Sequence, residues 1–404
     1  MTIQNISLRR ILIPVAVLSL LVYYILTWVN MLGSLYERTG SDFIGFYTFG
    51  RISQTMGYPS IYNVEEQQKL QEQIVGHPVT PIFYTHLPFI APIARILVTE
   101  DYIESFKRWA IVILLINAAS VFILMRLLDF SKLTTENLIL LSLGAYLFDP
   151  AFSGLMNGQD TALLLLGAAI WVYGLVSNNH TLSGLGLSLT TVRPQIALFL
   201  AIPFLFHHRR VFWSFVLGSS ILAVFSIGLL GQEGTIRFIE SIRYIESTVW
   251  QEAHALDMPT VSGIIRRNLV IHNFEPVQNL VWLLYILGIT GFSAVWWKST
   301  EIDERLIGLL SMAAIFLVPY AHYHDLILLL IPIFCLLRIY QIKDSVHQNR
   351  YSILPLTISW SLTLGFAGTG FLKFPVVYAV MLLISYFLIK ADKARKVSFP
   401  LQSG

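Results

Sequence analysis

Charged residues are scarce in this chain of 404 residues. Only 13% are Asp, Glu, Lys or Arg, whereas 55% are hydrophobic and the mean hydropathy is +0.66. A soluble domain carries roughly 25% charged residues, so the composition excludes an ordinary water-soluble globular protein. The net charge of +3 provides no basic field that would attract nucleic acid. The single cysteine, Cys335, lies in an apolar run, and an intrachain disulfide is impossible.

Familiar motifs of soluble nucleotide and hydrolase chemistry are also missing. The chain has no Walker loop, no dinucleotide-binding glycine fingerprint, no HExxH and no GxSxG. It shows no internal repeat of fixed period and no low-complexity tract. These absences disfavour soluble nucleotide chemistry and leave the membrane as the setting for any function.

Twelve apolar runs predict membrane helices, each of which typically takes about 20 residues. Several runs are shorter, which is typical of tilted helices or of helices shielded by neighbours. The runs cover residues 11–30, 108–126, 136–150, 160–176, 181–193, 196–207, 211–231, 276–297, 306–320, 325–340, 351–371 and 375–390.

A thirteenth run, Phe83 to Val98, contains Pro88, Pro92 and Arg95. We interpret it as re-entrant or interfacial, because a full span would move most Lys and Arg clusters out of the cytoplasmic connections in which they accumulate. We therefore predict an all-α integral membrane protein that forms one polytopic unit over residues 1–404. The chain would lie in the cytoplasmic (inner) membrane, with about twelve spans and both termini in the cytoplasm.

Two long segments then face outward, at residues 31–107 and 232–275. The first alternates aromatic and polar residues, which is typical of helices at the lipid headgroups. The second is predicted to be helical from Ile236 to Trp250, because its charges recur every three or four residues.

Polar residues near the outer ends of the spans are the candidates for function, because a charge there is costly without a partner or a role. Asp42 follows the first span and can be a helix N-cap or a general base. Asn157 and Gln159 belong to a predicted turn, after which Asp160 can cap the next helix, and the Asn157 and Gln159 side chains can also bond sugar hydroxyls. Arg193 stands beside a proline, where it can bind a phosphate, extend to the membrane surface or pair with a nearby Asp.

The densest polar cluster is Tyr320-Ala321-His322-Tyr323-His324-Asp325. A His-x-His pair with one acid is a thin basis for a metal site. Hydrogen bonding to a phosphate is the interpretation that we favour, and an interfacial anchor of His and Tyr is the alternative.

The order of these landmarks resembles the polyprenol-phosphate-mannose-dependent mannosyltransferases of glycosyltransferase family 87, which belong to the GT-C class of membrane transferases. The resemblance runs from about residue 38 to 390. It is carried by Asp42, Gly57 to Tyr62, Phe83-Tyr84 with Pro88 and Pro92, Gly158-Gln159, Arg193-Pro194, His207 to Arg210, Pro259 to Gly263, and His322. Related sequences often have Asn and Lys where this chain has Asp160 and Arg193.

The resemblance implies a GT-C-type helical bundle that transfers a sugar, mannose, from a polyprenyl-phosphate donor. The acceptor is a lipid or glycan of the cell envelope, reached from the outer face, and the displacement inverts the anomeric centre. Asp42 would be the catalytic base. The roles implied for the other residues are donor-phosphate binding by Arg193, His322 and His324, and substrate binding by Tyr84, Gln159 and Asn157. No cofactor is implied, and the chemistry does not require a metal.

Two other functions fit a polytopic chain. A transporter or lipid flippase would also have about twelve spans, but it should place ionisable groups at mid-membrane, whereas here they gather at one face. A scaffold subunit would tolerate replacement of Asp42.

Overall fold

The structure is a computed structural model that describes residues 8–34, 38–39, 41–83, 86–246, 258–268, 274–299, 302–343, 353–367 and 373–391. All secondary structure in these ranges is helical, which confirms the predicted all-α class. Within the described residues, each of the predicted apolar runs overlaps one or more helices.

The first part of the chain forms α1 (Leu8–Gly33), α3 (Phe43–Thr55), η1 (Tyr58–Ser60), α4 (Val64–Val75), η2 (Pro88–Ile90), α5 (Ala91–Leu97), α6 (Tyr102–Met125), η3 (Phe130–Lys132), α7 (Thr135–Tyr146), α8 (Asp149–Asn157) and α9 (Thr161–Val176). The rest forms α10 (His180–Leu189), η4 (Thr190–Val192), α11 (Pro194–Ala201), η5 (Ile202–Leu205), α12 (Arg209–Glu246), α14 (Val261–Asn268), α15 (Phe274–Lys298), α16 (Glu304–Leu317), η6 (Tyr323–Leu329), α17 (Leu330–Lys343), α19 (Leu354–Ala367) and α20 (Lys373–Lys390).

Seven helical stretches among the described residues are long and apolar enough to cross a membrane. They are Ile13–Gly33, Tyr102–Met125, Thr135–Asn157, Arg209–Tyr244, Pro276–Lys298, Tyr323–Gln341 and Lys373–Lys390. The chain is therefore a membrane protein, and length with composition supports fewer spans than the predicted twelve. Pro88–Leu97 is not among the seven. At 1.5 Å per residue this segment is about 15 Å long, half of the hydrocarbon thickness.

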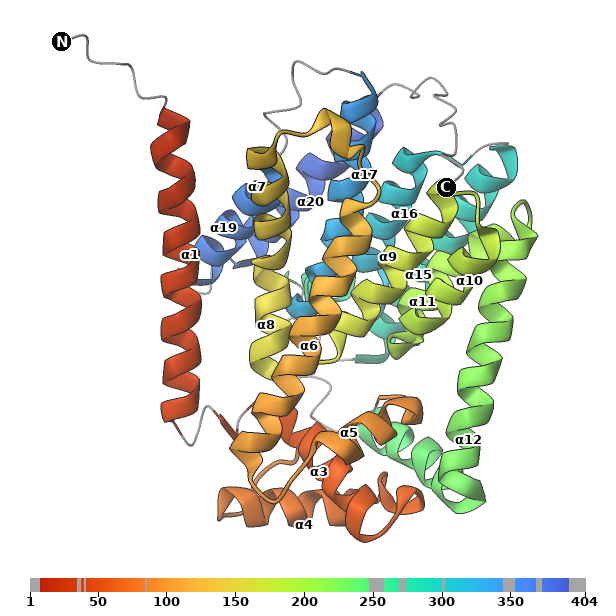
Figure 1. Ribbon diagram of the computed structural model, residues 1–404. Helices are drawn as coiled ribbons and strands as arrows, with labels where there is room; N and C mark the ends of the chain where they lie inside the picture. The colour runs from red at the N-terminus through yellow and green to blue at the C-terminus, as the bar shows by residue number, and fades with distance from the viewer. Residues whose placement is uncertain are drawn as a thin grey trace, which may run out of the picture.

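Figure 1 shows a bundle with a separate group of helices, α3, α4 and α5, at one end. α6 rises from this group into the bundle, and α12 descends along the opposite side to reach it. α12 is broken at Gly231, whose φ of 63° and ψ of −173° are not helical. Beyond the break α12 packs against η1 and η2, where the rings of Tyr62 and Phe238 lie 4.8 Å apart. The helix predicted from Ile236 to Trp250 is confirmed as far as Glu246, and residues 247–250 lie outside the described residues.

The polar helix α4 is attached to this group through glutamine side chains. The Gln67 amide donates to the Ile61 carbonyl, and Gln71 exchanges hydrogen bonds with the backbone of Ile82. Asn63 caps the start of the helix and Gly76, with a φ of 84°, ends it. These amide contacts add to the packing of Leu70 and Ile74 against the core.

The interior of the bundle is formed by α9, α10 and the unit of η6 and α17. α10 packs against both α9 and α12. The close approach to α12 depends on Gly184, because a Cβ there would lie 2.2 Å from the Val211 carbonyl oxygen. Every residue of η6 is buried, and η6 packs against α8, α9 and α16. The ends of α8, η4 and η6 thus come together inside the protein.

Candidate active site

Asp42 is the first residue of the site, at the N-cap position of α3. Its side chain makes no capping hydrogen bond. Instead the Gln159 amide donates to Asp42 Oδ2 over 2.6 Å. Asp42 remains partly exposed, whereas Gln159 is buried. Of the two interpretations of Asp42, the helix cap is therefore wrong, and its carboxylate is held by a residue 117 positions away.

Gly158 explains how Gln159 comes to face Asp42. Gly158 ends α8 in the left-handed conformation, with φ 70°, and its carbonyl accepts from the Trp109 indole over 2.8 Å. A Cβ at this position would lie 2.5 Å from the Cβ of Phe43, the residue next to Asp42. Only glycine allows both this turn and this contact, and together they bring the start of α3 against the end of α8.

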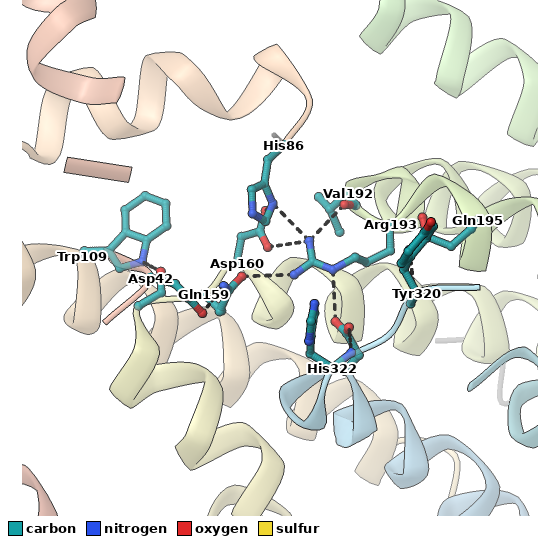
Figure 2. A network of polar contacts seen from close by, with 12 residues as sticks. Asp42, His86, Trp109, Gln159, Asp160, Val192, Arg193, Gln195, Tyr320 and His322 are labelled. Carbon is teal, nitrogen blue, oxygen red and sulfur yellow. Dashed lines mark hydrogen bonds and ion pairs between the residues drawn. The ribbon is translucent and has the colours of Figure 1, made fainter. Parts of the chain in front are cut away.

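Arg193, between η4 and α11, is the centre of the network in Figure 2. Its Nε donates to Asp325 Oδ1 over 3.1 Å, its Nη1 to Asp160 Oδ1 over 3.0 Å, and its Nη2 to Gln159 Oε1 over 3.1 Å. Nη1 also donates to the Val192 carbonyl. Asp160 and Asp325 are both 0% exposed. The interpretation of Arg193 as a partner for a nearby Asp is therefore confirmed, with two partners.

His86 lies against the same pair. Its Nδ1 is 2.8 Å from Asp160 Oδ2 and 3.1 Å from Arg193 Nη1. Burial alone would raise the pKa of Asp160, but His86 and Arg193 hold that pKa well below its usual range. One guanidinium thus faces two buried carboxylates, Asp160 and Asp325.

His322 and His324 stand on the first turn of η6, beside Arg193. The His322 backbone N–H donates to Asp325 Oδ2 over 2.8 Å, and the two imidazole centroids are 5.5 Å apart. Burial lowers the pKa of His322 to about 4, so this side chain is neutral at pH 7. It can offer one N–H but no charge. His324 is buried, and its Nε2 has no hydrogen-bond partner within the described residues.

These side chains come from α3, the α8–α9 turn, the η4–α11 junction and η6, and they bring a base candidate, an amide, a guanidinium and imidazoles together. The model of glycosyltransferase family 87 matches residues 84–321, more than half of the chain. The chain belongs to glycosyltransferase family 87. No curated protein and no solved structure matches it.

Membership makes this chain a membrane glycosyltransferase, and the transporter interpretation has no comparable support. The matched range includes Gln159, Asp160 and Arg193. It leaves out Asp42 and His322, so the roles of these two residues in this family 87 transferase depend on the geometry.

The structure does not bring every predicted site residue into the network. Asn157, the last residue of α8, is partly buried, and its side chain has no hydrogen bond to the described residues. Tyr84 lies outside the described residues. Among those that are described, no group of three His, Cys, Asp or Glu side chains is arranged to hold a metal ion.

Two members of the network, Asp160 and Asp325, were not assigned to the site of the transferase from sequence. Asp160 had only the role of a helix cap, yet it makes no capping hydrogen bond at the start of α9. The signal that pointed to both residues is Arg193 itself, because a guanidinium at a break between short apolar helices needs a buried acid.

Proposed function

We propose that this chain transfers mannose from a polyprenyl phosphate to a lipid or glycan acceptor, with inversion at the anomeric carbon. One observation carries the proposal: Gln159 holds a single oxygen of the Asp42 carboxylate. Asp42 Oδ1 has no hydrogen bond to any described residue, and Asp42 is partly exposed. A carboxylate that is fixed on one side and open on the other has the arrangement that a general base requires.

The reaction is a single displacement. The acceptor hydroxyl oxygen forms a bond to the anomeric carbon while Asp42 Oδ1 takes the hydroxyl proton. The bond between that carbon and the donor phosphate oxygen breaks, and its electron pair leaves with the lipid phosphate. The products are the new glycoside, a protonated Asp42 and the lipid phosphate as a dianion, so atoms and charge balance.

The leaving phosphate would be contacted by His322, with His324 as the second candidate. A neutral His322 supplies one N–H to a phosphate oxygen. Arg193 donates to Asp325, Asp160, the Val192 carbonyl and Gln159 through four of its five N–H groups, which leaves the second Nη2 hydrogen for a phosphate oxygen. Arg193 also holds the Gln159 carbonyl oxygen, so the Gln159 amide is left to donate to Asp42.

We also propose twelve crossings, with the site on the outer side. In support, α9 and α10 are joined by the short connection at residues 177–179 and pack against each other as an antiparallel pair, and η4 continues α10 as far as Val192. Basic residues occur at the ends of helices away from the group of α3, α4 and α5: Arg209 and Arg210 begin α12, whose far end packs on η1 and η2. Such residues accumulate on the cytoplasmic side.

The test compares Asp42→Asn with Asp101→Asn in purified protein supplied with radiolabelled polyprenyl-phosphate mannose and an envelope acceptor extract. Asp101 is an exposed N-cap at the start of α6, so the control removes the same charge from the same end of the bundle. We expect Asp42→Asn to lower the transfer rate by about 10²- to 10⁴-fold, the usual contribution of a general base. Asp101→Asn should leave the rate within about twofold, because surface substitutions are usually tolerated.

Equal transfer by Asp42→Asn and the unaltered chain would show that the base assignment is wrong. Transfer only from a glucosyl or other glycosyl lipid would contradict mannose, and transfer only from a nucleotide sugar would contradict the lipid donor.

A further inference from the structure

A second buried polar cluster lies apart from Asp42, at the break between α7 and α8. Asp149 is 4% exposed and accepts hydrogen bonds from three hydroxyls: Tyr24 on α1, Thr363 on α19 and Tyr323 on η6. No Lys, Arg or His of the described residues forms an ion pair with it. The reaction proposed above gives Asp149 no role.

The backbone at this break is held by the same set of hydroxyls. The Leu147 carbonyl accepts from Tyr24 over 2.8 Å and from Ser359 over 2.8 Å, and the Asp149 N–H donates to the Ser359 hydroxyl over 3.0 Å. α1, α8 and α19 thus form a fixed frame around Asp149. Tyr323 is the one hydroxyl donor to Asp149 that comes from the active-site turn.

Tyr323 lies between His322 and His324 in the sequence, and Asp325 follows His324. Asp325 accepts from the His322 backbone and binds Arg193 Nε, so the turn is attached to the site on one side and to Asp149 on the other. η6 is a 3₁₀ helix of seven residues. Such helices have poor hydrogen-bond geometry and are seldom this long, so they depend on outside contacts for their position.

We propose that Asp149 is a positioning residue of the transferase: through the Tyr323 hydroxyl it sets where His322 and Asp325 lie relative to Arg193. This inference depends on the proposed function for its effect on turnover. Its structural part, the attachment of η6 to the frame of α1, α8 and α19, can be measured without any substrate.

The test compares Tyr323→Phe with Tyr24→Phe. Both variants keep the ring. Tyr323→Phe removes the hydroxyl that donates to Asp149 Oδ2 from the active-site turn, whereas Tyr24→Phe removes a hydroxyl that lies 3.4 Å from Asp149 Oδ1, donates to the Leu147 carbonyl and has no contact with that turn. Phe at 323 also keeps the ring that lies 5.7 Å from Lys373 Nζ. We expect Tyr323→Phe to lower kcat at least tenfold with a KM within about threefold, and Tyr24→Phe to leave both within about twofold.

Backbone hydrogen exchange in lipid nanodiscs is the second readout. It should rise at residues 320–329 in Tyr323→Phe and not in Tyr24→Phe, whatever the substrate proves to be. This readout separates the inference from the proposed function: unchanged exchange overturns the inference even if transfer occurs, and a chain without transferase activity leaves the exchange prediction standing. Equal losses in both variants would mean that the cluster only stabilises the fold.

Asp149→Asn keeps the size of the side chain, and it replaces Tyr323→Phe as the test variant if Tyr323→Phe does not fold. The same rise in exchange at residues 320–329, larger than in α19, is then expected. An equal rise across α19 would overturn the positioning role.

Discussion

Replacing Arg193 by Met would leave two buried carboxylates, Asp160 and Asp325, without their cation. Breaking a buried ion pair from one side costs about 3–5 kcal/mol. The two pairs share one guanidinium, so the two costs do not add, and we expect a loss of about 3–5 kcal/mol in the free energy of unfolding. The stability loss of Arg193→Lys should be smaller than that of Arg193→Met but not zero. A lysine keeps the charge, but one ammonium cannot reach the three groups that Nε, Nη1 and Nη2 contact separately.

The assay is reversible unfolding in mixed micelles by a denaturing detergent, followed by tryptophan fluorescence. Arg108→Met is the matched control. Arg108 pairs with Glu104 over 2.9 Å, but both side chains are 47% exposed, and an exposed pair of this spacing contributes about 0.3–0.5 kcal/mol. A triple variant that adds Asp160→Asn and Asp325→Asn to Arg193→Met removes the uncompensated charge and should recover part of the loss.

The reasoning is refuted if Arg193→Met loses no more stability than Arg108→Met. It is also refuted if the triple variant is less stable than Arg193→Met alone, because the cost would then not come from unpaired carboxylates.

Two further predictions concern the turn beside Asp42 and the response to acid. Gly158→Ala should lower the free energy of unfolding by at least about 1–2 kcal/mol, because the φ of 70° disfavours a residue with a Cβ and that Cβ would meet Phe43. The same unfolding assay measures this loss, and a smaller loss would contradict the packing described. Burial lowers the pKa of His322 and of His208 from 6.5 to about 4, so the unfolded chain binds more protons between these values. Stability should therefore fall as the pH drops from 6.5 through 4. In a series of thermal unfolding measurements over this pH range, His208→Asn should show a shallower fall than the unaltered chain. An identical dependence on pH would mean that His208 does not contribute to the fall.

Hydropathy predicted the positions of the apolar helices well, because the residues within a stretch decide whether that stretch forms such a helix. The run predicted at 108–126 is α6, which starts earlier, at Tyr102, where the Asp101 side chain accepts from the Glu104 N–H. The break before Asp149 was less accessible. Pro150 is compatible with a new helix start, but the hydroxyls that hold the break come from α1 and α19, far away in the chain.

The site was predictable as a collection of residues at one end of the bundle and not as a set of contacts. Hydropathy shows at which end of a span a polar residue lies, whereas pairing depends on which spans are neighbours. Arg193 contacts Asp160 and Asp325, 33 and 132 residues away, and nothing in the local sequence distinguishes these acids from the others predicted at the same ends of the spans. Whether Tyr84 belongs to the site stays a prediction.

The position of Tyr24 has a consequence for how the protein is made. α1 stands beside the bundle, and its Tyr24 hydroxyl contacts Leu147, Asp149 and Ser359. The last of these is separated from it by 335 residues. At about 5–20 residues per second, the ribosome needs roughly 20–70 s to synthesise that stretch. During this time α1 can pack only against partners synthesised earlier, such as Phe106 and Leu147, and its contact with α19 must form by lateral diffusion once α19 has been inserted.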